Sequence, residues 1–253
     1  MIDCILGAAV GYTAEQIRPF LKSLSLSGYT GTCLVFCDGE TAEEVFRWGF
    51  DPLQPGPSVT KHPHSNRFFW IRDNIPADCE GALCLDTRDT VFQMNPESLP
   101  TEGLQVFEEA EFMSIGSCPY NSKWIKVGYG DAVLQQIQSA AILCVGSFCG
   151  EREAVQQYLG LLCDEIQLLQ PRTNEYQDQA AHNYLCWAAP HGPPNWDSWR
   201  NEESPIYTVG YLQRGTVQIA HGNIVNRSGQ VPAIIHQWDR HDNLKGLVHD
   251  RYQ

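Results

Sequence analysis

The stretch Gly81-Ala-Leu-Cys-Leu-Asp86-Thr-Arg-Asp89-Thr-Val-Phe-Gln93 decides the fold expected of this chain. Its apolar run, residues 82–85, is typical of a strand buried on both faces. Asp86 and Asp89 follow directly, and α/β sheets place ligands just past the carboxyl ends of such strands. Because Mg²⁺ and Mn²⁺ take carboxylate oxygens together with substrate phosphates, the stretch fits a metal–phosphate site. An acidic turn in which Arg88 pairs with a neighbour fits it equally well.

Short apolar runs alternate with helical patterns ahead of this stretch. The expected elements are a strand at 3–10, a helix from 13 to 28, a strand at 32–37, a helix at 41–48, a Pro-rich surface loop at 51–63 and a helix at 66–74. Thr13-Ala-Glu-Gln16 resembles a capping box, in which the Thr and Gln side chains bond each other's backbone N–H groups. Strands that alternate with helices predict βαβ units, and therefore an α/β fold with a parallel central sheet.

The second half of the chain has a less regular pattern. Its expected elements are a loop or lid at 97–109, a strand at 112–115, a ligand-contacting loop or plain turn at 121–130, a helix at 131–139, a strand at 140–145, an amphipathic helix at 152–169, a polar loop at 171–177, a helix beginning at Asp178, an irregular segment at 192–203, and strands at 216–220 and 233–235. No internal repeat or linker is apparent, so one domain over residues 1–253 is the economical interpretation.

Composition places the chain among globular proteins with an acidic balance. Its 253 residues are 43% hydrophobic and 19% charged, enough for one large buried core. The formal net charge of −13 argues against nucleic acid or an anionic membrane surface as the main partner. A phosphorylated small molecule remains compatible with this charge, because a bound cation supplies positive charge locally.

Ten cysteines are spread through the chain without a zinc or disulfide pattern. No Cys-x-x-Cys pair occurs, and several of the cysteines lie in apolar runs, where a free thiol behaves as a small buried hydrophobe. The N-terminal segment lacks the basic region of a signal peptide, and no stretch approaches the apolar length of a membrane span. We therefore expect reduced structural thiols in a cytoplasmic protein without an integral membrane segment.

Three further motifs carry chemistry at the ends of expected elements. Asp178 and Gln179 open a helix, where an Asp is most often a cap, although the Gln amide suits a hydroxyl-rich ligand. His236 follows an apolar run, as Asp86 does. An imidazole can bind Mn²⁺-type ions and phosphate. A lone histidine at a strand end is, however, more often a structural residue whose hydrogen bonds are satisfied. Residues 146–150 match neither standard phosphate-loop pattern, so close backbone approach to a ligand or a tight turn explains them as well.

These motifs occur in a recognisable order along nearly the whole chain. They are Val10-Gly-Tyr12, Cys84-Leu-Asp86-Thr-Arg-Asp89-Thr-Val-Phe-Gln93, Gly146-x-x-x-Gly150, Asp178-Gln179-Ala-Ala-His-Asn183 and Ile235-His236-Gln-Trp-Asp-Arg240. Together they resemble the nucleotide-sugar glycosyltransferases of the GT-A fold, above all the branch whose Asp-x-Asp metal motif has the form Asp-Ser-Arg-Asp-Val-x-Phe-Gln. The resemblance implies a Rossmann-like, mostly parallel central sheet flanked by helices in a single domain. Residues 1–95 would form its nucleotide- and metal-binding half, and residues 110–253 its sugar and acceptor half.

The resemblance also implies roles for individual residues. Asp86 and Asp89 would hold Mn²⁺ or Mg²⁺ against the donor diphosphate, with His236 as the third protein ligand. Asp178 and Gln179 would be the catalytic pair that faces the donor sugar near its anomeric carbon. The donor-binding residues would be Asp86 and Arg88, then Ala8, Ala9, Gly11, Tyr12 and Arg67 at the nucleoside, and Gly146 and Gly150 beside the sugar or acceptor. The Asp-x-x-Asp spacing departs from Asp-x-Asp, so it stays open whether both carboxylates touch the metal or Asp86 acts through water or the ribose.

The activity implied is transfer of a sugar from a nucleoside-diphosphate sugar, with UDP favoured, to a hydroxyl of a glycan or other acceptor. Such a transfer needs the leaving diphosphate stabilised as it gains charge, which a bound divalent cation does as a Lewis acid. The Asp-Gln pair favours retention of anomeric configuration, whereas inversion would need a carboxylate base on the acceptor hydroxyl. A membrane-bound acceptor would be met peripherally.

Two other classes of protein stay open. One is a sugar-phosphate nucleotidyltransferase, although no Gly-rich loop bearing Lys or Arg follows the first strand. The other is a catalytically silent module that binds a nucleotide or a sugar. A purely structural protein is disfavoured, because it would not need carboxylates and a histidine at the ends of several strands.

Overall fold

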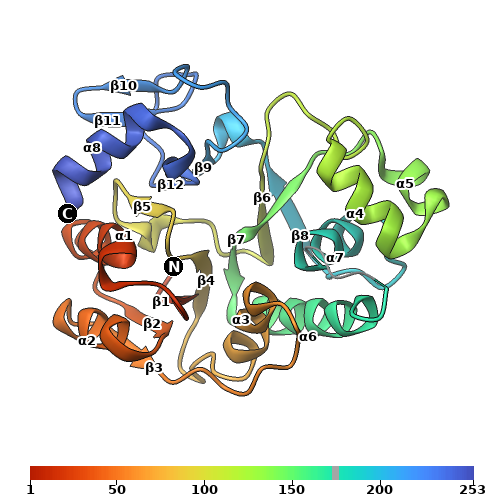
Figure 1. Cartoon of the computed structure of the whole chain (residues 1–253), viewed down its shortest axis with the longest axis horizontal. Coiled ribbons are helices and arrows are strands. Elements are labelled where there is room, and N and C mark those ends of the chain that lie inside the picture. The colour runs from red at the N-terminus through yellow and green to blue at the C-terminus, as the bar shows by residue number, and fades with distance from the viewer. Residues whose placement is uncertain (173–176) are drawn as a thin grey trace.

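A central sheet flanked by helices forms the body of the protein in the computed structural model, which describes residues 1–172 and 177–253 (Figure 1). The strands are β1 (Cys4–Ala8), β2 (Thr32–Phe36), β3 (Asp51–Leu53), β4 (Gly81–Asp86), β5 (Thr90–Phe92), β6 (Leu104–Glu108), β7 (Leu143–Glu151), β8 (Trp196–Trp199), β9 (Ile206–Thr208), β10 (Gln218–Ala220), β11 (Asn223–Val225) and β12 (Ile234–His236). The helices are α1 (Ala14–Leu26), α2 (Gly39–Arg47), α3 (Pro63–Arg72), α4 (Pro119–Tyr129), α5 (Asp131–Ile137), α6 (Arg152–Leu169), α7 (Gln177–Trp187) and α8 (Asp242–Tyr252), with 3₁₀ turns η1 (Pro96–Ser98), η2 (Asn201–Glu203) and η3 (Trp238–Arg240). Of the polar loop expected at 171–177, residues 173–176 lie outside the described residues.

Seven strands form the central sheet in the order β3-β2-β1-β4-β7-β6-β8. All are parallel except β7, which runs antiparallel to both of its neighbours. Strand β4 lies in the middle, and its side chains alternate between two core clusters, with Ala82 and Cys84 in one and Leu83 and Leu85 in the other. Burial on both faces explains the continuous apolar run of this strand. The mostly parallel sheet expected from the sequence is confirmed.

Helices cover both faces of this sheet (Figure 1). On one face α1 packs through Ile17 and Phe20, and α2 through Val45, whereas α3, α6 and α7 belong to the cluster on the other face. Helix α1 begins with the expected capping box. The Thr13 hydroxyl accepts from the Gln16 N–H at 3.3 Å, and Gln16 Oε1 accepts from the Thr13 N–H at 2.9 Å.

A three-stranded sheet, β5-β12-β9, carries much of the C-terminal part of the chain. Strand β12 runs antiparallel to β5, so that His236 lies opposite Thr90, and it packs with α8 in an apolar cluster of its own. Asp89 immediately precedes β5. The pairing of β12 with β5 therefore brings His236 beside the acidic loop that follows β4, although these residues are far apart in the sequence.

Two expectations for the middle of the chain are wrong. Residues 97–109 contain β6, an inner strand between β7 and β8, instead of forming a loop or lid. Residues 146–150 continue β7 instead of forming a tight turn. A Cβ at Gly150 would lie 2.1 Å from the Gly103 carbonyl oxygen, so this glycine allows the close approach of a neighbouring strand.

Four local expectations also differ from the structure. Residues 121–130 lie mostly in α4, because Pro119 opens a helix whose buried positions Asn121, Ile125 and Gly128 have helical spacing. Residues 192–203, expected to be irregular, contain β8. Residues 51–63, expected to be a surface loop, begin with the edge strand β3. Residues 112–115, expected to be a strand, make only a single bridge between Ser114 and Ala141. The other expected helices and strands lie within a few residues of their expected positions.

Two further expectations concern the cysteines and the membrane. All ten cysteines are buried free thiols, as expected. Over the described ranges, no helix combines the length and the hydropathy needed to cross a bilayer.

Candidate active site

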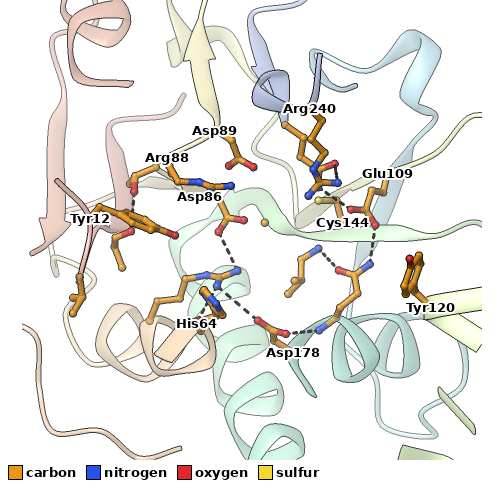
Figure 2. Close-up of a pocket in the computed structure, with 18 of the residues that line it drawn as sticks. Tyr12, His64, Asp86, Arg88, Asp89, Glu109, Tyr120, Cys144, Asp178 and Arg240 are labelled. Carbon is orange, nitrogen blue, oxygen red and sulfur yellow. Dashed lines mark hydrogen bonds and ion pairs between the residues drawn. The ribbon is translucent and has the colours of Figure 1, made fainter. Parts of the chain in front are cut away.

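A cleft of about 600 Å³ opens at the carboxyl ends of β1 and β4 (Figure 2). This is the edge where α/β sheets bind ligands, and both halves of the chain line it. The lining residues include Ala8 and Tyr12 from β1 and the turn after it, Arg67 of α3, Asp86, Arg88 and Asp89 after β4, Glu109 after β6, Tyr120 and Trp124 of α4, Cys144 and Gly146 of β7, Asp178 and Gln179 of α7, and Tyr211, Gln237 and Arg240 from the C-terminal part.

Asp86, Asp89 and His236 come together at this cleft, with one ligand atom of each within 4.8 Å of the others. His236 Nε2 lies 3.7 Å from Asp86 Oδ2 and 3.6 Å from Asp89 Oδ1. These separations are too long for hydrogen bonds, but they suit ligands of one divalent ion whose bonds are each about 2.1 Å. His236 Nε2 is buried and has no hydrogen-bond partner within the described residues. A buried nitrogen that makes no hydrogen bond and lies beside two carboxylates fits the position of a metal ligand.

Gly146 leaves room for the cluster. A Cβ at this position would lie 2.5 Å from Asp86 Oδ2 and 2.7 Å from His236 Cε1. On the other side of the imidazole, His236 Nδ1 lies 3.6 Å from Cys144 Sγ on the same strand as Gly146. Two carboxylates, one imidazole with an unpartnered nitrogen and a backbone that approaches without a side chain together fit a divalent cation such as Mn²⁺ or Mg²⁺.

Arg67 links this cluster to α7. Its Nη2 lies 3.0 Å from Asp86 Oδ1, and its Nη1 lies 3.7 Å from Asp178 Oδ2. Burial by itself raises the pKa of Asp86, but Arg67 and His236 outweigh burial and lower this pKa to about 2. Asp86 is therefore ionised across the neutral range, and Arg67 orients its carboxylate.

Glu109 and two glutamines form a hydrogen-bonded network elsewhere in the cleft (Figure 2). Gln179 Nε2 donates to Glu109 Oε2 at 3.1 Å, and Gln237 Nε2 donates to Glu109 Oε1 at 2.8 Å. Burial raises the pKa of Glu109 by more than the hydrogen bond from Gln237 lowers it. Gln179 also donates to the Leu143 carbonyl oxygen and accepts from the Val145 N–H, which fixes its amide against β7.

The segment after β12 completes the cleft. Gln237 has a left-handed backbone, with φ of 62°, and its N–H donates to the Asp89 carbonyl oxygen at 2.7 Å. Arg240 Nη1 donates to Gln237 Oε1 at 2.7 Å, and Arg88 Nη2 pairs with Asp239 Oδ2 at 2.9 Å. The His-Gln-Trp-Asp-Arg motif is therefore tied both to the acidic loop and to the Glu109 network.

Most of the residues expected at the site lie together in the cleft. These are Ala8, Tyr12, Arg67, Asp86, Arg88, Asp89, Gly146, Asp178 and Gln179, with His236 joined to them through the cluster. Ala9, Gly11 and Gly150 lie elsewhere. Ala9 is buried in the core cluster that contains α1, Gly11 forms a turn with φ of +77°, and Gly150 pairs with Ala82 inside the sheet.

Sequence analysis missed several residues of the cleft. Glu109 follows β6, and because that strand was mistaken for a loop, the carboxylate at its end carried no signal. Tyr120 and Tyr211 lie outside every motif, and only the tertiary structure places them at the cleft. Trp124 belongs to the aromatic segment for which ligand contact was one of two interpretations.

Comparison with known proteins defines the class of fold. No family model matches this sequence, and no curated protein matches it. Among solved structures, the chain is similar to the galactosyltransferase LgtC, crystallised in complex with donor and acceptor sugar analogues. The TM-score is 0.55 and the identity 16%, over 98% of this chain and 95% of that one. The chain therefore has the α/β fold of a GT-A glycosyltransferase, as the sequence motifs led us to expect.

Proposed function

We propose that the protein is a metal-dependent glycosyltransferase. It would move a sugar from a nucleoside-diphosphate sugar, with UDP as the favoured carrier, to a hydroxyl of a glycan or other acceptor, with retention of anomeric configuration. One observation carries the proposal above the others: the cluster of the half-buried Asp86 with the buried Asp89 and His236 at the ligand-binding edge of a GT-A fold. His236 Nε2 lies within 4 Å of both carboxylates yet makes no hydrogen bond within the described residues, an arrangement that suits three ligands of one shared cation.

The chain's own residues prepare the cluster to hold Mn²⁺ or Mg²⁺. Asp86, Asp89 and His236 would hold the ion, Arg67 orients Asp86, and Gly146 leaves the space open. Once bound, the ion would supply Lewis-acid stabilisation of the charge that develops on the leaving diphosphate. Both carboxylates face His236 at similar distances, which supports direct contact of each with the metal rather than contact through water.

We further propose that Asp178 and Gln179 face the donor sugar near its anomeric carbon. Both line the cleft, and Asp178 shares Arg67 with the metal ligand Asp86. The amide of Gln179 is held by β7 and Glu109, so its position is rigid before any donor arrives. Rigid polar groups beside the reacting carbon are what pre-organised stabilisation of the transition state requires.

The donor nucleoside would lie on the β1 side of the cleft, where Tyr12 and Arg88 are found (Figure 2). Residues 1–95 would then form the nucleotide- and metal-binding half, and residues 110–253 the sugar and acceptor half. We place the enzyme in the cytoplasm, peripheral to a membrane if its acceptor is membrane-bound, and we expect no nucleic-acid partner, in line with the net charge of −13.

A thermal-shift panel tests this proposal. The ligands are UDP, GDP, dTDP and CMP, each with Mn²⁺ and with EDTA. A nucleotide present at about 100 times its Kd adds roughly 2.7 kcal/mol to the free energy of unfolding, which raises the Tm by roughly 5–10 °C. We expect this shift with UDP and Mn²⁺ and its loss in EDTA. Absence of a shift with every nucleotide would contradict the metal–nucleotide site.

A second experiment separates a transferase from a silent binding module. The protein is incubated with UDP-sugars and Mn²⁺, and released UDP and free sugar are measured with water as the acceptor. We expect slow hydrolysis of one donor, with NMR showing first the anomer that has the donor's configuration. Nucleotide binding without any release of UDP would support the binding module, and the opposite anomer would contradict retention.

A further inference from the structure

A group of aromatic side chains lies in the cleft away from the metal cluster. Tyr120 and Trp124 stand one turn apart on α4, both line the cleft, and their ring centroids are 6.0 Å apart. Tyr120 is 61% exposed. A ring this open contributes little to folding, and exposed aromatic surface at a cleft is typical of a binding site.

Gln179 connects α4, the helix that carries this aromatic pair, with Glu109. Asn121, the residue after Tyr120, has its Oδ1 3.5 Å from Gln179 Nε2, and the same nitrogen lies 3.1 Å from Glu109 Oε2. At the start of the helix, the Tyr211 hydroxyl lies 3.6 Å from Cys118 Sγ. One end of the cleft therefore combines aromatic rings with a buried carboxylate, and Figure 2 shows Glu109 and Tyr120 on the side opposite Tyr12.

The carboxylate still has capacity for a ligand. Each Glu109 oxygen accepts one side-chain amide N–H, from Gln237 and Gln179, and each oxygen has a second lone pair. A hydroxyl donor satisfies such a carboxylate without adding charge to the cleft. An acyl chain would cover the aromatic rings but would remove Glu109 from water with nothing to donate to it, which is costly.

A pyranose ring has both features that this end of the cleft requires. The C–H groups on one face of the ring are apolar and stack on an aromatic side chain, while the hydroxyl groups at its edge donate hydrogen bonds. The metal cluster and this end of the cleft belong to one continuous cavity, so a sugar bound here would lie within the same site as the donor.

We propose that Tyr120, Trp124 and Glu109 form an acceptor-sugar subsite, in which a pyranose ring stacks on the aromatic pair and donates a hydroxyl hydrogen bond to Glu109. The inference rests on the proposed function and narrows it, because it makes the acceptor a glycan. It also assigns acceptor specificity to α4 and to the end of β6.

Saturation-transfer-difference NMR tests the subsite on the full chain with UDP and Mn²⁺ present. The probes are lactose, cellobiose, maltose and methyl β-N-acetylglucosaminide. At least one probe is expected to bind, with strongest transfer to the protons on one ring face. Tyr120→Ala and Glu109→Gln are each expected to weaken the binding of that probe about three- to tenfold. Phe46→Ala is the matched control, because Phe46 is 74% exposed on α2 and should bind the probe as the wild type does.

A thermal shift with UDP and Mn²⁺ in the same samples reports the donor site separately. A normal nucleotide shift with no probe signal, or with equal probe affinity in Tyr120→Ala, Glu109→Gln and wild type, would overturn the subsite and leave the proposed function standing. A probe signal that depends on Tyr120 without any nucleotide shift would support the subsite and overturn the transferase. Tyr120→Ala decides the outcome if Glu109→Gln fails to fold, because the Tyr120 ring is mostly exposed.

Discussion

At the scale of single residues, His236 is better explained by a ligand than by stability. Its Nε2 is buried, faces two carboxylates and has no hydrogen-bond partner in the part of the chain that the structure describes. A buried polar atom left unsatisfied costs about 1–3 kcal/mol, so folding alone disfavours this arrangement. Gly146 belongs to the same arrangement, since any larger residue would contact both Asp86 and His236.

Asp89→Asn is expected to abolish most of the metal-dependent nucleotide shift, because it removes one negative charge from the cluster at nearly constant volume. The Tm of the metal-free protein should change little, because the substitution removes both the attraction to His236 and the repulsion from a nearby carboxylate. Thermal shift with UDP and Mn²⁺ measures both quantities. Asp164→Asn, an exposed change of the same charge on α6, is the control and should behave as wild type. An equal loss of Tm with and without ligand would indicate a structural carboxylate instead.

Gly146→Ala is expected to weaken Mn²⁺ binding by about 10–100-fold, because the new methyl group displaces Asp86 and His236 from their positions. Isothermal titration with Mn²⁺ alone measures the change. Gly160→Ala makes the same substitution on α6, where nothing lies within 4 Å of the added carbon, and it should bind Mn²⁺ as the wild type does. Wild-type affinity in Gly146→Ala would place the metal site elsewhere.

At the scale of elements, the contrast between α6 and β6 shows which patterns can be recognised locally. Helix α6 buries Val155, Leu159, Leu162 and Ile166 at helical spacing, and its bounds are those expected from the sequence. Strand β6 includes Gln105, whose Oε1 accepts from Trp199 Nε1 of β8 at 2.7 Å. That partner is distant in the sequence, so the buried polar residue made the strand look like a loop.

The middle of α6 offers a prediction about stability. Gly160 lies within the helix, and Gly160→Ala adds a methyl group in open space. Alanine is favoured over glycine in a helix interior by about 0.5–1 kcal/mol, so the free energy of unfolding should rise by that amount. Denaturant unfolding measures this increase in the free energy of unfolding, and the dependence of that free energy on denaturant concentration should stay the same. A decrease in stability would show that the helix is distorted at this residue.

At the scale of the whole molecule, the cleft exists because two sheets meet. The central sheet positions Asp86 and Gly146, whereas His236 ends β12 in the middle of the β5-β12-β9 sheet and Asp89 directly precedes β5. The loop between β4 and β5 joins the sheets. A ligand at this junction would therefore stabilise the contact between the two parts of the chain as well as the local loop.

Stability of the whole fold should fall on mild acidification because of His182. Burial lowers the pKa of this imidazole to about 3, whereas its ordinary value is about 6.5. Between these values the unfolded chain binds a proton that the folded chain does not, so stability falls as the pH drops. The loss from this residue is about 2 kcal/mol between pH 7 and pH 5. Denaturant unfolding at pH 7 and at pH 5 measures this loss. The free energy of unfolding should fall less in His182→Asn than in the wild type, and an equal fall in both proteins would show that another group is responsible.

Much of the fold and part of the site could be predicted from local patterns. The acidic loop was predicted because a continuous apolar run followed by two carboxylates is a local signal. Gly150 lies against Gly103 inside the sheet, and the sequence does not distinguish a glycine that approaches a ligand from one that approaches another strand. Glu109 and Tyr120 were missed because neither lies at the end of an element that was recognised.

By itself, the sequence determined many of the buried strands and amphipathic helices, and it placed Asp86, Asp178 and His236 at the ends of such elements. Periodicity and the ends of apolar runs are properties of neighbouring residues, so they are visible without a fold. Only the tertiary structure decided which of these ends meet. Register between β12 and β5 sets His236 beside Asp89, and the burial of β6 sets Glu109 beside Gln179 and Gln237. These pairings depend on contacts between distant segments, and a one-residue slip in any of them would turn the side chain to the other face of the sheet.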